Sequence, residues 1–198
     1  QHEKIREAAY SLIDASERPV LHRRIGELML ARAKDREAGI KEEVFYIVRH
    51  LNAGAAVLTD PDSRFELAWL NYLAGEKARS STAYDAAGDY LSRAVALMPE
   101  NQWTAHYDFA WSLHMALSET LFLTGRLADA DRIFDALLAN ARDNLWRAEV
   151  YGLMVTLNTA IDKPEKALEI GLRGLELLGM KIPKNPGKLP RSEEHTSE

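Results

Sequence analysis

The apolar residues of this chain recur with the spacing of amphipathic α-helices along most of its length. Near the start, five of them follow the i, i+3, i+4, i+7, i+8 pattern that places side chains on one helix face: Ile5, Ala8, Ala9, Leu12 and Ile13. The pattern returns in the second half of the chain, in Leu127, Ala130, Ile133, Phe134, Leu137, Leu138 and Ala141. No convincing alternating run of the kind that forms β-strands is present. The pattern therefore predicts an all-α fold.

The positions at which the periodic apolar pattern is interrupted predict about nine helices joined by short connections. Their expected spans are residues 3–15, 20–34, 40–58, 62–79, 82–97, 103–123, 126–142, 144–161 and 164–178. Asp60 precedes Pro61, an order that suits the cap and the first turn of a helix. Thr82 and Asp85 have the spacing of a capping box. Because the connections are short, neighbouring helices should form antiparallel hairpins.

A repeated spacing of small and large residues relates three parts of the chain. It appears in the second helix of three predicted pairs as Ala87, Leu91, Ala94 and Pro99; Ala130, Phe134, Leu137 and Arg142; and Ala167, Gly171, Gly174 and Gly179. The preceding helices match more loosely, with Asn71, Ala74, Gly75 and Ala78; His114, Leu117, Ser118 and Leu121; and Tyr151, Met154, Val155 and Asn158. The spacing resembles that of the tetratricopeptide repeat. This resemblance implies hairpins stacked as a degenerate solenoid, with repeats near 68–101, 111–144 and 148–181.

Longer strings resemble one region of large bacterial multidomain signalling proteins. In chain order they include HEKIREAAYSLI, LHRRIGELML, IVRHLNAGAAVL, LAWLNYLAGEKARSSTAYDAAGDYL and ALEIGLRGLELLGMKIP. The most specific runs are HLNAG at 50–54 and AGEKARSSTAY at 74–84. In that family, a serine/threonine protein kinase domain and an AAA-type ATPase precede a tetratricopeptide-like region. A GAF sensor follows, often with a histidine kinase or other output domain. The resemblance covers residues 2–183.

The resemblance implies a division of the chain into segments. Residues 1–15 would be the terminal helix of the preceding ATPase module, residues 16–60 connecting helices, and residues 61–182 the tetratricopeptide-like repeats. Residues 183–190 have the proline-rich composition of a linker. The last eight residues, RSEEHTSE at 191–198, resemble a translated sequencing adapter and are excluded from fold and site reasoning. The chain is then expected to be an internal, metagenomic fragment of a longer protein.

Composition narrows the classes of function. The chain has 198 residues, a formal net charge of −5 and no cysteine. The absence of cysteine excludes a disulfide framework, a thiolate zinc site and a cysteine nucleophile. Mild acidity and the shortness of the basic runs argue against nucleic-acid binding. No apolar run reaches the length of a membrane helix, and with the family resemblance we expect a cytoplasmic protein that contacts no membrane.

No complete catalytic, cofactor or metal motif is present. The run AGEKARSS around Lys77 lacks the second glycine and the preceding strand of a phosphate-binding loop. His22, His50 and His114 lack the acidic residue that follows a phosphoacceptor histidine in histidine kinases. We therefore expect no catalytic residue, cofactor or metal in this segment, whereas the resemblance implies ATP and magnesium in a parent kinase or ATPase.

Three functional hypotheses remain. The first is a non-catalytic scaffold that couples the flanking ATPase to a downstream sensor in the same chain. The second is a free-standing tetratricopeptide adaptor, and the third is a segment that itself hydrolyses ATP or relays phosphate. The gene on either side of the fragment would separate the first two hypotheses.

The remaining candidates for function lie on the first helix of each predicted repeat. In tetratricopeptide arrays these helices line a concave groove that meets the partner. Carried over by resemblance, its positions are Trp69, Tyr72, Glu76, Arg79, Met115, Glu119, Phe122, Glu149 and Thr156. Such a groove would bind a peptide or helix of another protein through apolar anchors and charged rims. The alternative is burial of the apolar members against adjacent helices, and the sequence leaves both interpretations open.

Overall fold

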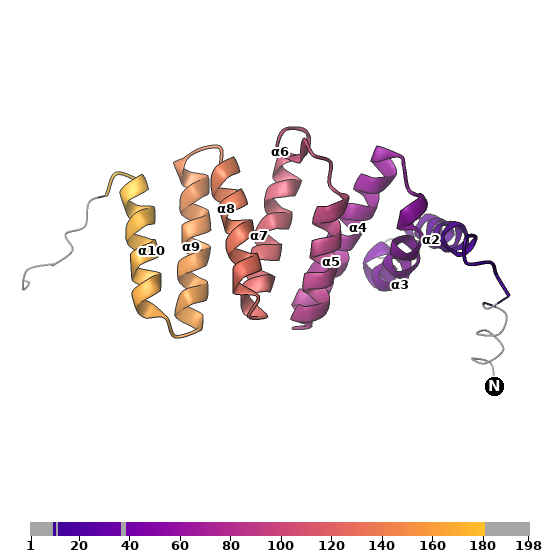
Figure 1. The fold of residues 1–198 in the computed structure, drawn as a ribbon, viewed down its shortest axis with the longest axis horizontal. Coiled ribbons are helices and arrows are strands. Elements are labelled where there is room, and N and C mark those ends of the chain that lie inside the picture. Colours follow the sequence, from indigo (N-terminus) through magenta and orange to yellow (C-terminus); the bar gives the residue numbers. More distant parts are fainter. Residues whose placement is uncertain (1–9, 11, 37–38, 181–198) are drawn as a thin grey trace, which may run out of the picture. The chain divides into compact units, whose positions relative to one another are not determined.

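The computed structural model describes residues 10, 12–36 and 39–180 (Figure 1). Within these residues every regular element is a helix and no strand occurs. The α-helices are α2 (Arg18–Lys34), α3 (Gly39–Ala53), α4 (Pro61–Ser80), α5 (Tyr84–Leu97), α6 (Gln102–Ala105), α7 (Tyr107–Leu123), α8 (Leu127–Asn140), α9 (Asn144–Ala160) and α10 (Pro164–Leu177), with a 3₁₀ turn η1 (Ala55–Val57) after α3. The predicted all-α class is confirmed, and no helix in the described part is long and apolar enough to cross a membrane.

The described residues divide into two compact units on either side of Ala136, inside α8. In the first unit α2 packs against α3, α4 packs against both α3 and α5, and α5 packs against α7. In the second unit α9 and α10 lie side by side and run antiparallel (Figure 1). Hairpins of neighbouring helices, as the short connections predicted, therefore organise both units.

The core of the first unit joins α2, α3 and α4. Its buried members are Leu30, Ala33, Val44, Ile47, Val48, Leu70 and Ala74. The three branched residues from α3 have no exposed surface, which places this helix at the centre of the cluster. Burying an aliphatic side chain of this size contributes about 1.5–3 kcal/mol. The core thus fixes one face of α4 toward α3 and leaves its other faces for α5 and α7.

One turn geometry recurs after α4, α7, α9 and α10. The second residue past each helix has a positive φ: 58° for Thr82, 77° for Gly125, 56° for Asp162 and 82° for Gly179. The next amide donates to the carbonyl five residues back, at 2.9 Å for Ala83 to Ala78, Arg126 to Leu121 and Lys163 to Asn158, and at 3.0 Å for Met180 to Leu175. This closure satisfies helix-end carbonyls that would otherwise lack partners. The first three turns occupy the same place in each predicted repeat.

The two predicted helix caps near α4 have different outcomes. Asp60 caps α4 as predicted, because its carboxylate accepts from the amide of Ser63 at 2.8 Å. The predicted capping box at Thr82 is wrong. Thr82 lies in the left-handed turn after α4, where its hydroxyl donates to the carbonyl of Ser81 at 2.7 Å, and Ala83 precedes α5 without a side-chain cap. A β-branched residue seldom adopts this backbone conformation, so a threonine here did not indicate a turn.

The predicted helix 103–123 is broken at His106. Its φ of −136° and ψ of 41° separate the short α6 from α7. The imidazole stacks on the ring of Phe65 with centroids 4.0 Å apart. Phe65 belongs to α4 and is distant from His106 in the sequence. Local periodicity therefore could not predict this contact or the break in the helix.

The ends of the chain are described only in part. Of the predicted helix 3–15, residues 12–15 form turns and bends, so that part of the prediction is wrong. Residues 3–9 and 11 lie outside the described residues, as do the predicted linker 183–190 and tail 191–198.

The predicted helix 40–58 ends early because α2 passes close to Gly54. A Cβ atom on this glycine would lie 2.7 Å from the backbone nitrogen of Arg23 and 2.8 Å from the carbonyl oxygen of Pro19. Only glycine allows so close an approach of two backbones. The chain then forms η1, and Arg23 donates to the carbonyl of Val57 at 3.2 Å.

Small and large residues face each other across two hairpins. A Cβ atom on Gly75 of α4 would lie 2.6 Å from Cγ of Leu91 on α5, a side chain with no exposed surface. At the equivalent positions of α9 and α10 the sizes are exchanged, since Gly171 faces Val155 with 3.5 Å between the ideal Cβ position and Cγ2. The predicted repeats thus differ in sequence at these two aligned positions, but each hairpin keeps one small and one large residue in contact.

We predict that Gly75→Ala destabilises the protein and Gly152→Ala stabilises it. The first variant overpacks the contact with Leu91 and should lower the free energy of unfolding by about 1–2 kcal/mol, even after the helix-propensity gain. The second places a methyl group at an exposed position of α9 with no atom within 4 Å and should gain about 0.5–1 kcal/mol. Urea unfolding followed by circular dichroism measures both. A neutral or stabilising Gly75→Ala would contradict the close approach of α4 and α5.

Candidate functional site

One stripe of α4 carries the predicted groove residues of the first repeat. Trp69, Tyr72, Glu76 and Arg79 are spaced three or four residues apart and so lie along one side of the helix. The adjacent stripe, which includes Ala74, Gly75 and Ala78, is buried. This burial turns the first stripe away from α5.

Arg79 joins this stripe of α4 to α7. Its Nη1 donates to Oε1 of Glu76 at 2.6 Å, and its Nη2 donates to Oε2 of Glu119 on α7. The Arg79 side chain is 21% exposed, and its Nε is buried with no partner among the described residues. Burial alone would lower the pKa of Arg79, but the hydrogen bond to Glu76 and the charges of Glu119 and Glu76 raise it above its ordinary value. The guanidinium therefore remains charged and forms the fixed polar centre of this surface.

An aromatic contact next to Arg79 also joins α4 to α7. The rings of Tyr72 and Phe109 meet edge to face with centroids 5.4 Å apart, and Phe109 contacts Phe65 at the same distance. Burial raises the pKa of Tyr72, and the charge of Glu76 adds to this effect while that of Arg79 opposes it. The phenol thus stays protonated near neutral pH and presents both an apolar ring and a hydrogen-bond donor.

Two adjoining hollows flank α4 on the side of α3. The first, of about 450 Å³, is lined by Ala33, Lys34, Arg36, Ile40, Lys41, Trp69 and Leu73. The second, of about 420 Å³, is lined by Lys41, Val44, Leu73, Glu76, Lys77 and Ser80. Lys41 and Leu73 line both hollows, which therefore adjoin one another. Depressions of this size accept a side chain or a short segment of a partner.

Four of the predicted groove residues come together: Tyr72, Glu76, Arg79 and Glu119. We call this set the α4–α7 face. Trp69 is 38% exposed and lines the neighbouring hollow, so it extends the face toward α3.

The other predicted residues lie elsewhere or are less accessible. Met115 lies on α7 one turn before Glu119 and is half-buried. Phe122 is only 4% exposed and adds almost no accessible surface. Glu149 and Thr156 are exposed on α9, in the second unit.

Sequence reasoning missed Leu73 and Phe109. Leu73 follows Trp69 by four residues, so helical spacing alone could have placed both on adjoining positions. Phe109 lies two residues before the predicted start of the second repeat at residue 111, and no local signal indicates its contact with Tyr72.

The run AGEKARSS around Lys77 does not form a phosphate-binding loop. Gly75 and Lys77 lie inside the continuous helix α4. The Lys77 ammonium donates to the carbonyls of Lys41 at 2.7 Å and Glu42 at 3.0 Å. It also lies 5.0 Å from the centroid of the Phe45 ring, so this lysine ties α4 to α3. In the described part of the chain, no group of three or more His, Cys, Asp or Glu residues could hold a metal ion.

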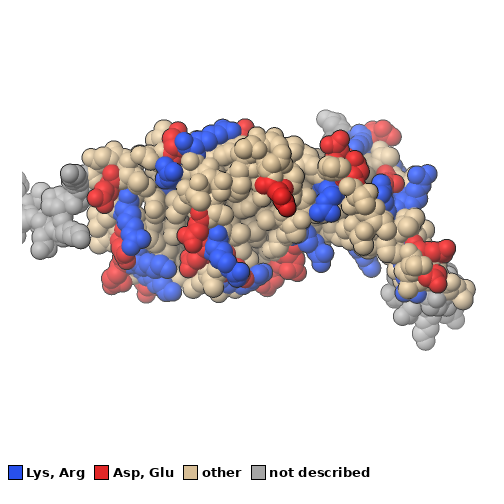
Figure 2. All heavy atoms as spheres, turned by 45° about the horizontal axis from the view of Figure 1, so that its top comes forward, with Lys and Arg blue, Asp and Glu red and all other residues tan. Residues whose placement is uncertain are grey.

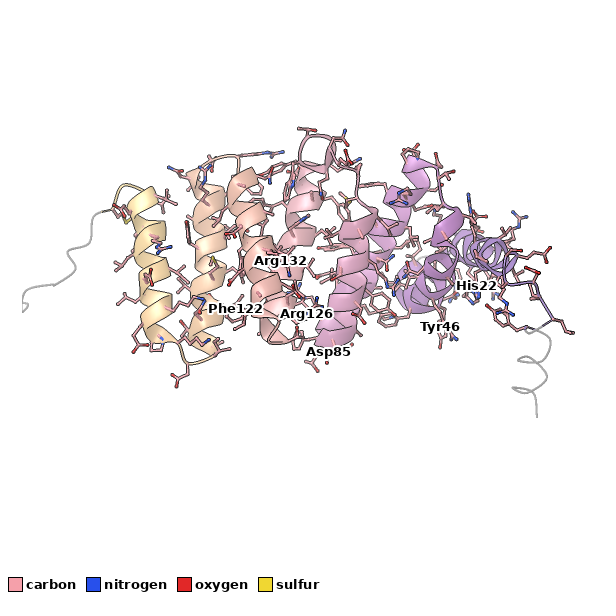
Figure 3. All side chains as sticks on the ribbon, viewed as in Figure 1. His22, Tyr46, Asp85, Phe122, Arg126 and Arg132 are labelled. Atoms are coloured by element: carbon pink, nitrogen blue, oxygen red, sulfur yellow. The ribbon has the colours of Figure 1, made fainter. Side chains whose placement is uncertain are left out.

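A short hydrogen-bonded chain links two of the histidines. His22 of α2 (Figure 3) accepts from or donates to Tyr10 at 3.0 Å through Nε2 and meets Nδ1 of His50 at 2.9 Å through its own Nδ1. Burial lowers the pKa of His50, and the charges of His22 and Arg49 lower it further. The contact connects α2 to α3.

We predict a measurable coupling between Arg79 and Glu119. A double-mutant cycle with Arg79→Met and Glu119→Gln should give a coupling free energy of about 1 kcal/mol, because the pair is partly shielded from water. The control cycle uses Arg173→Met and Glu169→Gln, an exposed pair within α10 whose side chains are 64% and 62% exposed. Its coupling should be about 0.3–0.5 kcal/mol. Equal coupling free energies from urea unfolding would show that the Arg79–Glu119 pair stabilises the protein no more than an exposed ion pair within one helix does.

We also predict that acid weakens the contact between α2 and α3. Because the folded-state pKa of His50 lies below its ordinary value of 6.5, the unfolded chain binds more protons as the pH falls through that value. Stability should therefore decline between about pH 7.5 and about pH 5.5. In His50→Asn, which keeps an amide for His22, the decline should be smaller. An identical pH dependence in both proteins, measured by urea unfolding, would exclude His50 as a source of it.

Comparison with known proteins gives one informative similarity. No family model and no solved structure matches the chain. The chain is 23% identical over 201 residues to part of a protein from Dictyostelium discoideum named hybrid signal transduction histidine kinase G, with 90% of this chain covered. The chain spans only 6% of the length of that protein. The similarity is therefore to one segment of a much longer signal-transduction protein.

Proposed function

We propose that this chain is a non-catalytic, tetratricopeptide-like scaffold of a multidomain signalling protein and binds a peptide or helix on the α4–α7 face. The observation that carries the proposal is the half-buried cluster of Tyr72, Glu76, Arg79 and Glu119, held in place by ion pairs and an aromatic contact. A surface ordered before binding loses little side-chain entropy when a partner docks. Exposed Trp69 and the adjoining hollows supply room for apolar anchors.

The helical hairpins support a repeat architecture. The same left-handed turn connects α4 to α5, α7 to α8 and α9 to α10. Small residues occupy contact positions in the α4–α5 and α9–α10 hairpins, and in a solenoid each hairpin completes the core of its neighbour. By resemblance, the flanking partners are an ATPase module and a sensor of the same cytoplasmic chain, and ATP and magnesium belong to the ATPase or kinase modules.

The similarity to the Dictyostelium protein supports a role in signal transduction. That organism is not a bacterium, so the proposal rests on the multidomain signalling context rather than on a bacterial origin. The scaffold would couple an ATPase to a sensor or output domain through contiguous packed helices. A free-standing adaptor would use the same face, and the uninterrupted gene distinguishes the two.

The charge of the α4–α7 face indicates the chemistry of its partner. Glu76 and Glu119 contribute two negative charges and Arg79 one positive charge, which leaves a net charge of −1. Trp69 and Tyr72 provide aromatic surface beside these charges. We therefore expect an amphipathic helix or peptide with apolar anchors and at least one basic side chain.

We predict that an amphipathic helical peptide with lysines beside its apolar stripe binds the 198-residue chain. Tyr72→Ala combined with Trp69→Ala should weaken its binding by at least about tenfold, because aromatic anchors carry most of the affinity of such interfaces. Fluorescence anisotropy of the labelled peptide measures the dissociation constant. Tyr46→Ala removes an exposed tyrosine outside the α4–α7 face and should leave the constant unchanged.

Two results would count against this function. Unchanged affinity in the Trp69 and Tyr72 double variant would exclude the α4–α7 face as the docking surface. ATP turnover by the purified chain that disappears in Lys77→Ala or His50→Ala would instead support the enzymatic hypothesis. Radiolabelled ATP tests this directly. The contacts of Lys77 with the carbonyls of α3 favour a structural role for this residue.

A further inference from the structure

A second groove lies between α3 and α5, the second helices of their hairpins. It has a volume of about 730 Å³ and is lined by Phe45, Tyr46, Arg49, Asn52, Ala53, Ala86, Asp89, Tyr90 and Arg93. None of these residues belongs to the α4–α7 face. The groove therefore offers a separate surface in the first unit.

The aromatic floor of the groove is ordered. The rings of Phe45 and Tyr90 stack with centroids 5.7 Å apart and bridge α3 to α5. Asn52 at one end exchanges two hydrogen bonds of 2.9 Å with buried Asn71, which fixes its amide. Tyr46 projects from α3 and is 64% exposed (Figure 3). The groove thus combines a rigid base with a large aromatic side chain that has little protein contact.

Two unpaired arginines border this floor. Arg49 on α3 and Arg93 on α5 are exposed, and neither forms an ion pair with a carboxylate of the described residues. By contrast, Arg36 and Arg79 each bind two carboxylates. Asp89 is the acidic residue of the lining, so the groove has a net charge of +1 in a chain whose formal net charge is −5. This local reversal of sign favours an anionic partner.

We propose that the α3–α5 groove binds an acidic linear segment of a partner protein. An aromatic or leucine side chain of the segment packs on Phe45, Tyr46 and Tyr90. Its carboxylates lie against Arg49 and Arg93, whose planar guanidinium groups can each donate two parallel hydrogen bonds to a carboxylate. The aromatic side chains supply the apolar contact area of the interface, and the arginines select the charge of the partner.

The observations favour an acidic peptide over a nucleic acid. Two cations and one aspartate provide far less positive charge than a phosphate backbone requires for useful affinity. Blue and red side chains lie next to one another over the surface shown in Figure 2, without a continuous basic stripe. The proposal also goes beyond the docking role of the α4–α7 face, which has the opposite charge and prefers a basic peptide.

The test uses the 198-residue chain and two labelled pools of short peptides. One pool surrounds a single tryptophan or leucine with aspartate and glutamate, and the matched pool carries asparagine and glutamine instead. The acidic pool should bind at least about tenfold more tightly, and Arg49→Gln combined with Arg93→Gln should remove most of that preference. Tyr46→Ser should weaken binding of both pools. Arg24→Gln removes an exposed arginine of α2 outside the groove and should change nothing, and thermal unfolding checks that every variant is folded.

Several outcomes would overturn the proposal. Equal affinity for the two pools, or an undiminished preference in the double arginine variant, would show that the arginines do not select carboxylates. A labelled single-stranded oligonucleotide that bound more tightly than the acidic pool and depended on Arg49 and Arg93 would assign the groove to nucleic acid. Self-association that disappeared in Tyr46→Ser, detected by sedimentation velocity, would assign it to a second copy of the chain. The basic-peptide assay is independent, so a negative result here leaves the α4–α7 face untouched.

Discussion

The close approach of α4 and α5 at Gly75 is the constraint on which the first unit depends. A side chain at this position would overlap Leu91, so the helix must present its glycine to α5. This contact fixes the rotation of α4 about its axis. Ala74 and Ala78 are then buried, and Arg79 points toward Glu119 on α7. The candidate docking face is therefore a consequence of backbone packing, because a rotation of α4 by one residue would move its charged stripe away from α7.

The two runs that carry the family resemblance consist largely of contacts between helices. In HLNAG, His50 meets His22, Asn52 exchanges hydrogen bonds with Asn71, and Gly54 admits the backbone of α2. In AGEKARSSTAY, the glycine packs on α5, Lys77 binds carbonyls of α3 and Arg79 reaches α7. These residues specify how the helices join, and each is costly to replace because it is tied to a distant partner. Contacts between helices therefore account for several residues of both strings.

Periodicity predicted the helices well because the spacing of apolar residues within a helix is enough to indicate its buried face. It failed where a distant residue or an unusual backbone decides the geometry. Thr82 occupies a turn position where Gly125 shows the expected residue type, so the turn that it forms was interpreted as a helix start. His106 interrupts its helix while stacking on Phe65 of α4. The α4 stripe of the site was expected from the tetratricopeptide resemblance, whereas the Arg79–Glu119 link and the α3–α5 groove depend on which helices become neighbours.

The two proposed surfaces meet at the α4–α5 hairpin, on different helices of it, and carry opposite net charge. The α4–α7 face belongs to first helices and the α3–α5 groove to second helices, while α4 packs directly on both α3 and α5. Partners of opposite charge could therefore occupy the two surfaces together without competing. The Gly75 contact joins α4 to α5 and the hydrogen bonds between Asn71 and Asn52 join α4 to α3, so a shift of α4 stabilised by one partner would also change the contacts beside the other site. A coupling free energy of about 1–3 kcal/mol would change the affinity for the second partner by about 5- to 150-fold.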